Sequence, residues 1–170
     1  MAEKMQTIQD LMVTGLTYVL DFEQKVSEAA GKMADASTNS DVKEVFEKSQ
    51  TKGKQYAERI QQAFGTLNVP LETNTNEIAH AMITEVENMI SNTDAGAVRD
   101  AALIVAANQM QHYRVAVYGS METYAKLIGK NDAGELMKQN LEDSKGGDAK
   151  LTGIAEETVN PQAAEQMQHA

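Results

Sequence analysis

Apolar residues recur at helical spacing through most of the chain, and this periodicity constrains the fold more than any other feature. In the first third of the sequence one helical face carries Leu11, Met12, Leu16, Val19, Phe22, Val26, Ala29 and Met33. Only two prolines occur in 170 residues, so long helices can run without interruption. No segment shows the strict alternation of a half-buried strand. The pattern therefore predicts an all-α protein.

Capping and turn residues divide this pattern into five helices. Residues 7–10 resemble a capping box, so the first helix is expected to follow them and to end at 37–39. Ser40 is expected to cap a second helix that stops at the loop before Pro70. A shorter helix then covers about 76–90, a fourth runs to Ile128, and a fifth runs from about 131 to Val159.

This organisation predicts one domain over residues 1–160, with an antiparallel four-helix bundle and one additional short helix. Residues 161–170 have no apolar period and are expected to form a flexible C-terminal tail.

Composition excludes several classes of function. The chain has no cysteine, which rules out disulfides, thiol catalysis and sites with cysteine ligands. Its net charge of −10 disfavours nucleic acid as a partner. No stretch is long and apolar enough to predict a membrane span, and the first residues lack the apolar core of a signal peptide. We expect a cytoplasmic protein without nucleic-acid or membrane partners.

Polar residues interrupt the apolar stripes near the middle of several helices. Glu23 shares a stripe with Leu16 and Val19, and Ser144 and Asp148 share one with Met137 and Leu151. The fourth helix has a polar belt between two apolar segments, consisting of Asn108, Gln109, Gln111, His112 and Arg114. Because buried polar groups are costly unless paired, this layer predicts a metal or catalytic site or a satisfied core network.

Gly146 and Gly147 lie together inside the expected fifth helix, where each costs about 1 kcal/mol relative to alanine. Two interpretations of this pair stay open. The glycines can provide a kink or close helix packing, or they can loosen an opening beside the polar layer.

Several segments of the chain resemble the YciE/YciF-type ferritin-like family of bacterial stress-associated proteins. The resemblance covers roughly residues 20–155, and its most distinctive part is residues 98–104 (VRDAALI) followed by His112 and Tyr113. The other matching segments are residues 21–25, 42–47, 58–60, 141–143 and positions 145, 148, 150 and 151. The resemblance implies a ferritin-like bundle, a homodimer and, in typical members, a two-metal carboxylate site.

The metal ligands of that family are mostly missing from this sequence. The helix 2 pattern His-Leu-Glu-Glu-Thr, often followed by His or Lys, is replaced by Ser49, Gln50, Thr51, Lys52 and Gly53, followed by Lys54. The pattern Glu-His-Tyr-Glu becomes Gln111, His112, Tyr113 and Arg114, and Glu-Glu-Lys becomes Asp143, Ser144 and Lys145. Hard metal ions need several anionic oxygens together, so these losses predict a degenerate site.

Two functional hypotheses remain. In the favoured one the protein is a stress-associated, non-catalytic structural or interaction protein with no cofactor. Glu23 is then paired with Lys54 or Arg114, and Gln111 and Ser144 complete the hydrogen bonds. In the alternative it is an iron- or manganese-dependent oxidase or peroxide-handling protein. Its remodelled site would use the surviving candidate ligands Glu23, His112, Asp143 and Asp148.

Overall fold

The computed structural model describes residues 4–166, and every regular element in that range is helical. The four long helices are α1 (Ile8–Ala36), α2 (Ser40–Leu67), α4 (Ala97–Leu127) and α5 (Asn131–Ile154). The shorter helix α3 (Glu77–Ser91) lies between α2 and α4 in sequence. After α5 the chain passes through one π-helical turn, η1 (Ala155–Val159), into α6 (Asn160–Gln166). The all-α prediction is confirmed, and no described helix is long and apolar enough to cross a membrane.

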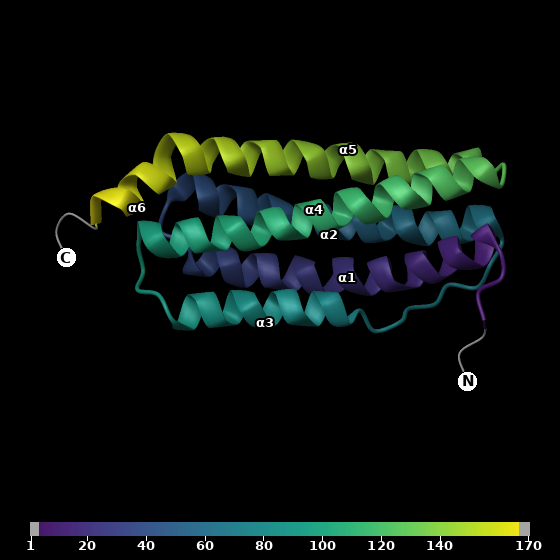
Figure 1. The fold of residues 1–170 in the computed structure, drawn as a ribbon, viewed down its shortest axis with the longest axis horizontal. Coiled ribbons are helices and arrows are strands. Elements are labelled where there is room, and N and C mark those ends of the chain that lie inside the picture. Colours follow the sequence, from purple (N-terminus) through teal and green to yellow (C-terminus); the bar gives the residue numbers. More distant parts are fainter. Residues whose placement is uncertain (1–3, 167–170) are drawn as a thin grey trace.

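The long helices pack side by side around a common core (Figure 1). Helix α1 packs on α2, α2 on α5, α5 on α4, and α4 on α1, while α3 covers α1 and α4. Each of these long neighbours runs in the opposite direction to the next (Figure 1). Helix α3 and the loop before it carry the chain back along the molecule, so α2 and α4 run in the same direction.

Side-chain caps fix where the helices begin. The capping box predicted at the start of α1 is confirmed, because Thr7 and Asp10 each bind the backbone N–H of the other. The cap predicted for α2 at Ser40 is wrong by one residue. Asn39 caps this helix, since its side-chain oxygen accepts from the backbone of Asp41 and Val42.

The C-terminal helix continues beyond the end expected from the sequence. Its backbone passes through Pro161 to Gln166, within the segment that was expected to be a tail. The π-helical turn immediately before it changes the hydrogen-bond pattern where Pro161 has no N–H to donate. The last part of the expected tail, residues 167–170, lies outside the described residues.

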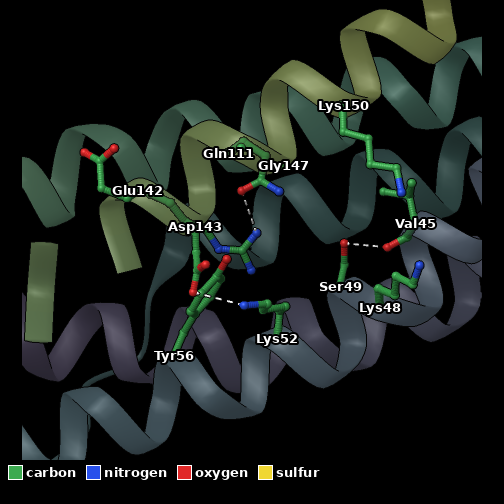
Figure 2. Close-up of a pocket in the computed structure, with 12 residues that line it drawn as sticks. Val45, Lys48, Ser49, Lys52, Tyr56, Gln111, Glu142, Asp143, Gly147 and Lys150 are labelled. Carbon is green, nitrogen blue, oxygen red and sulfur yellow. Dashed lines mark hydrogen bonds and ion pairs between the residues drawn. The ribbon is translucent and has the colours of Figure 1, made fainter. Parts of the chain in front are cut away.

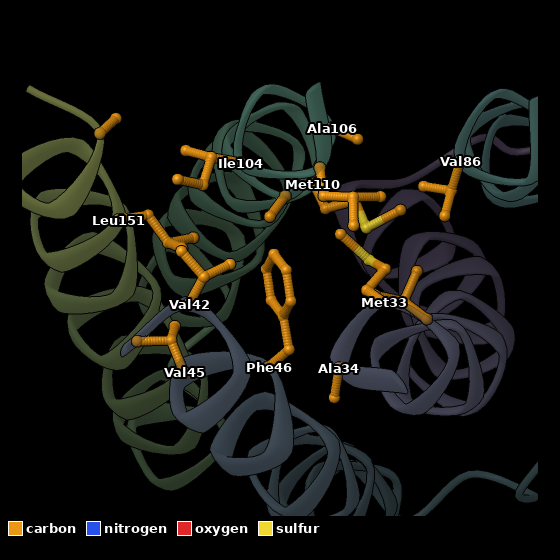
Figure 3. Close-up of a cluster of buried hydrophobic side chains, with 14 of the residues drawn as sticks. Met33, Ala34, Val42, Val45, Phe46, Val86, Ile104, Ala106, Met110 and Leu151 are labelled. Atoms are coloured by element: carbon orange, nitrogen blue, oxygen red, sulfur yellow. The ribbon is translucent and has the colours of Figure 1, made fainter. Parts of the chain in front are cut away.

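Two apolar clusters fill the core, one toward each end of the long helices. The first surrounds Phe46, which points between the four long helices toward Met110 and Ile104 (Figure 3). The second contains Leu16 and Phe64 and lies nearer the start of α1. Glu23, Tyr56, Gln111 and Arg114 belong to neither cluster, although all four are buried.

Candidate functional site

A buried ion pair between α1 and α4 forms the centre of the polar layer. Glu23 is completely buried, and Arg114 is 3% exposed. The Arg114 Nε donates to Glu23 Oε1 at 2.9 Å, and its Nη2 donates to Oε2 at 2.7 Å. This two-point contact is the strongest geometry available to a guanidinium and a carboxylate. Of the two predicted partners of Glu23, Arg114 is confirmed and Lys54 is wrong, because Lys54 lies exposed on α2.

Two tyrosines complete the surroundings of the pair. The hydroxyl of Tyr118 donates to Glu23 Oε1 at 2.6 Å, and the ring of Tyr56 lies 5.2 Å from the Arg114 guanidinium carbon. Burial, together with the negative charge of Glu23, raises the pKa of Tyr118 well above its usual value. Burial also raises the pKa of Tyr56 to about 12, although the Arg114 charge opposes this shift. Both hydroxyls therefore stay protonated at neutral pH.

Helical spacing explains how α4 supplies most of these groups. Gln111, Arg114 and Tyr118 are separated by three and four residues, so they share one face of α4. That face is buried against α1 and α5, and it places Arg114 opposite Glu23 of α1. Burial lowers the pKa of Arg114, but the adjacent Glu23 charge reverses this effect and keeps the pKa above its usual value. The arrangement fixes a permanently charged guanidinium opposite a carboxylate.

A cavity of about 330 Å³ leads from the surface to this pair, between α2 and α5 (Figure 2). Arg114 and Gln111 form its inner end, and the Gln111 Oε1 accepts from Arg114 Nη1 at 3.3 Å. The remaining lining residues are Val45, Lys48, Ser49, Lys52, Tyr56, Glu142, Asp143, Gly146, Gly147 and Lys150.

Asp143 lies at the side of this cavity, between two cations of α2. Its Oδ2 is 3.1 Å from Lys52 Nζ and 2.8 Å from Arg59 Nη1. Partial burial pushes the pKa of Asp143 upward, but the hydrogen bonds and charges of Arg59 and Lys52 lower it overall. Asp143 is therefore an ionised partner of two cations, and its oxygen is already engaged.

The positions compared with the family's ligand pattern divide into two groups. Ser49, Lys52, Gln111 and Arg114 line the same cavity, together with the candidate ligand Asp143. Thr51 and Lys54 are exposed on another face of α2. Ser144 is fully buried, but its hydroxyl donates to the Asn140 carbonyl and makes no hydrogen bond to Glu23, contrary to expectation. Gln111 does join the hydrogen bonds of the pair as expected, because it accepts from Arg114.

The four candidate metal ligands do not come together. His112 is mostly exposed and faces Asp148, with 3.3 Å between Nε2 and Oδ1, while Glu23 and Asp143 have their own cationic partners. Within residues 4–166, no three Asp, Glu or His side chains form a group that could hold a metal ion. The described residues therefore do not fit a two-metal centre, which needs carboxylates that bridge the ions.

Sequence reasoning missed Tyr118, the third member of the buried network. Its signal was present, because Tyr118 lies one helical turn after Arg114 on a stripe that already held two polar residues. A buried tyrosine usually finds a hydrogen-bond partner, so its place beside a buried carboxylate could have been anticipated.

The sequence matches a known protein family and a relative of nearly the same length. The family described as Domain of unknown function (DUF892) matches residues 7–164. The chain is 32% identical to protein YciF of Escherichia coli (strain K12) over 160 residues, which cover 94% of this chain and 96% of that protein.

Three solved structures have a similar fold. The crystal structure of the E. coli stress protein YciF matches with a TM-score of 0.88, over 92% of this chain and 99% of that one. YcfI from Rhodopseudomonas palustris, which has been proposed to be a structural protein, is 26% identical and matches with a TM-score of 0.85, over 89% and 97% of the two chains. A Xanthomonas campestris protein at 15% identity and a TM-score of 0.76, covering 95% of this chain and 99% of that one, shares the fold.

Proposed function

The chain belongs to the DUF892 family, and we propose that this member is a non-catalytic, ferritin-like four-helix-bundle protein associated with stress. In it, an internal ion pair takes the place of a two-metal carboxylate site. The observation that carries this proposal is the saturation of Glu23. Both of its oxygens accept from Arg114, and one also accepts from Tyr118, so a metal ion would have to displace the guanidinium that already neutralises this carboxylate.

Charge at the surrounding positions supports the same conclusion. Arg114 and Lys52 line the cavity at positions where the family's pattern has carboxylates, and both carry positive charge. A divalent cation placed there would meet Arg114 and Lys52, while the carboxylates of Glu23 and Asp143 are already paired with these two groups. Electrostatics therefore opposes a cation in this cavity.

Metal analysis tests this proposal directly. We expect protein from cells grown with added iron and manganese, and purified without chelator, to hold far less than one ion per chain. About two ions per chain would overturn the proposal and support the oxidase or peroxide-handling alternative.

A matched variant makes the measurement informative. Ser49→His, Lys52→Glu, Gln111→Glu and Arg114→Glu together restore ligand types at cavity-lining positions beside Glu23. We expect this variant to bind iron or manganese if it folds. Two exposed changes, Thr51→Glu and Lys54→His on the other face of α2, add ligand types outside the cavity and should not create metal binding.

We also propose that the protein acts as a homodimer through the face formed by α1, α3 and α4. Three large apolar side chains of this face are exposed: Leu11 (38%), Tyr18 (42%) and Ile78 (51%). All three line one mostly apolar hollow of about 830 Å³. An exposed apolar area of this kind marks protein contacts in soluble proteins. Sedimentation at tens of micromolar should give a dimer, and Ile78→Asp should give a monomer. A wild-type protein that stays monomeric would contradict this part of the proposal.

A further inference from the structure

We propose that the cavity between α2 and α5 binds a small, multiply charged oxyanion such as phosphate or a small phosphate ester. This inference rests on the proposed function, because it requires the cavity to hold Arg114 and Lys52 rather than metal ligands. It goes further by assigning a ligand class to the space that these residues create.

The inner end of the cavity presents buried hydrogen-bond donors. Gln111 is 5% exposed, and its carbonyl oxygen accepts from Arg114, so its amide NH2 is the end of the side chain that lies toward the cavity-lining Gly147. An added Cβ at Gly147 would lie 2.6 Å from this nitrogen, so the amide lies directly against the glycine that lines the cavity. Arg114 has five N–H groups, of which three make hydrogen bonds to Glu23 and Gln111. The donors that remain suit an anion.

The outer part of the cavity is cationic although the whole chain is strongly acidic. Lys48, Lys52 and Lys150 line it, and Lys150 extends its ammonium group from α5 toward Val45 on α2 (Figure 2). Lys150 makes no ion pair within residues 4–166. An isolated cationic site on a chain of net charge −10 is a place where an anion gains most from binding.

The two acidic residues of the lining do not cancel this charge. Asp143 is paired with both Lys52 and Arg59, so this group carries a net positive charge. Glu142 is exposed and pairs with Lys145, which does not line the cavity. Lys48 is paired with Glu44, whose charge also acts on Lys150, so the excess positive charge comes from Lys150 and from the Arg59–Lys52–Asp143 group. Two positive charges in excess favour a dianion over a monoanion. The volume of about 330 Å³ leaves room for phosphate with water or for a small organic substituent.

The glycine pair of α5 keeps this cavity open. Gly147 touches Gln111 so closely that any larger residue would displace the amide, whereas Gly146 has no atom within 4 Å of an added Cβ. Of the two interpretations of this pair, close helix packing describes Gly147, which touches α4, while Gly146 lies beside the cavity opening without such a contact.

An NMR titration with inorganic phosphate at constant ionic strength, on chelator-treated full-length protein, tests the inference. We expect saturable shifts in the side-chain amide signal of Gln111, and weaker binding of acetate. Lys150→Gln should weaken phosphate binding about threefold to fivefold, the upper range for one exposed charge. Lys138→Gln makes the same charge change on the same helix, and neither Lys138 nor its partner Glu135 lines the cavity, so it should leave binding within experimental error.

The glycines provide a second, independent pair of variants. Gly147→Ala should displace the Gln111 amide and weaken binding, while Gly146→Ala gains the same helix propensity and should bind like the wild type. The inference is overturned if phosphate produces no saturable shift, or if Lys138→Gln weakens binding as much as Lys150→Gln. Metal content is measured separately, so bound metal would contradict the proposed function, whereas metal-free protein without phosphate binding would contradict only this inference.

Discussion

Two buried carboxylates of this protein are stabilised in different ways. Glu23 is 0% exposed and is held by the side chains of Arg114 and Tyr118. Asp100, at the start of α4, is 1% exposed. It accepts from the backbone N–H of Thr38 and of Asn39 and from the Thr38 hydroxyl, at 2.6–2.9 Å. One charge is met by a cation across the core, and the other by neutral groups of the α1–α2 loop.

This difference determines whether each network can be replaced as a unit. The donors around Glu23 are side chains, so substitution can remove all of them together with the charge. Two of the three donors to Asp100 belong to the backbone, and no change of side chain removes them. We infer that the Glu23 network is replaceable by apolar residues, whereas the Asp100 anchor is not.

The largest loss of stability should come from removing one member of the Glu23–Arg114 pair. Arg114→Met leaves a buried carboxylate without its cation, and Glu23→Met leaves a buried guanidinium without its anion. Each change should lower the free energy of unfolding by about 3–5 kcal/mol, measured by urea denaturation.

The same experiment compares the single changes with their combination. Glu23→Met with Arg114→Met and Tyr118→Phe should recover most of the loss, because an apolar replacement of a buried pair is often neutral or stabilising. If the combined variant is as unstable as the sum of its parts, the pair is not replaceable and the contrast with Asp100 fails.

A smaller loss should follow from Asp100→Asn. The amide retains one acceptor and turns a new NH2 group toward donors of the α1–α2 loop, so we expect a loss of about 2–3 kcal/mol in the free energy of unfolding. Thr38→Val removes one donor only and should cost about 1 kcal/mol. Full stability of the Asp100→Asn variant in urea would show that this carboxylate is not an anchor.

The helices were predictable because they rest on local signals. The spacing of apolar residues and the capping box at Thr7 are read within a few positions, and both agree with the structure. The α2 cap was misplaced by one residue because Asn39 and Ser40 are both good caps, and only the backbone geometry distinguishes them. The helical continuation through Pro161 depends on the π turn before it, which periodicity does not signal.

The polar layer was predictable in position but not in its pairing. The stripe of α1 placed Glu23 inside, and the belt of α4 offered several partners, but residue spacing cannot tell which residue of α2 or α4 meets it in space. Lys54 was a wrong choice because it lies two positions after Lys52, on the exposed side of α2. Pairing between helices depends on their relative rotation, which only the packed structure provides.

Alkaline pH should weaken the protein through the tyrosines of the Glu23 network. Tyr118 keeps its proton in the folded state, because burial and Glu23 raise its pKa, whereas in the unfolded chain it loses the proton near pH 10. Stability is therefore complete below pH 10 and falls above it, by up to about 1.4 kcal/mol per pH unit for each such tyrosine. Tyr56, whose pKa is raised to about 12, contributes over pH 10–12.

Tyrosine variants separate this effect from general alkaline unfolding. Urea midpoints between pH 9 and pH 12 should fall less steeply for Tyr118→Phe than for the wild type. Tyr18→Phe, at a 42% exposed position outside the network, keeps the apolar ring of the proposed dimer face and should keep the wild-type slope. Equal slopes for all three proteins would mean that the Tyr118 hydroxyl does not control the alkaline loss.

The smallest effect should come from the ion pair at the side of the cavity, which extends the comparison to a partly exposed carboxylate. The side chains of Lys52 and Asp143 are 44% and 30% exposed, and Asp143 keeps Arg59 as a second partner when Lys52 is removed. Lys52→Gln should therefore change the free energy of unfolding by less than about 1 kcal/mol. This small difference should shrink further in 1 M salt, because water and ions reach the pair. The loss caused by Arg114→Met should stay nearly constant over the same salt range, since that pair is excluded from solvent. Equal salt sensitivity of the two variants, measured as urea midpoints at low and high sodium chloride, would show that solvent reaches the Glu23 network.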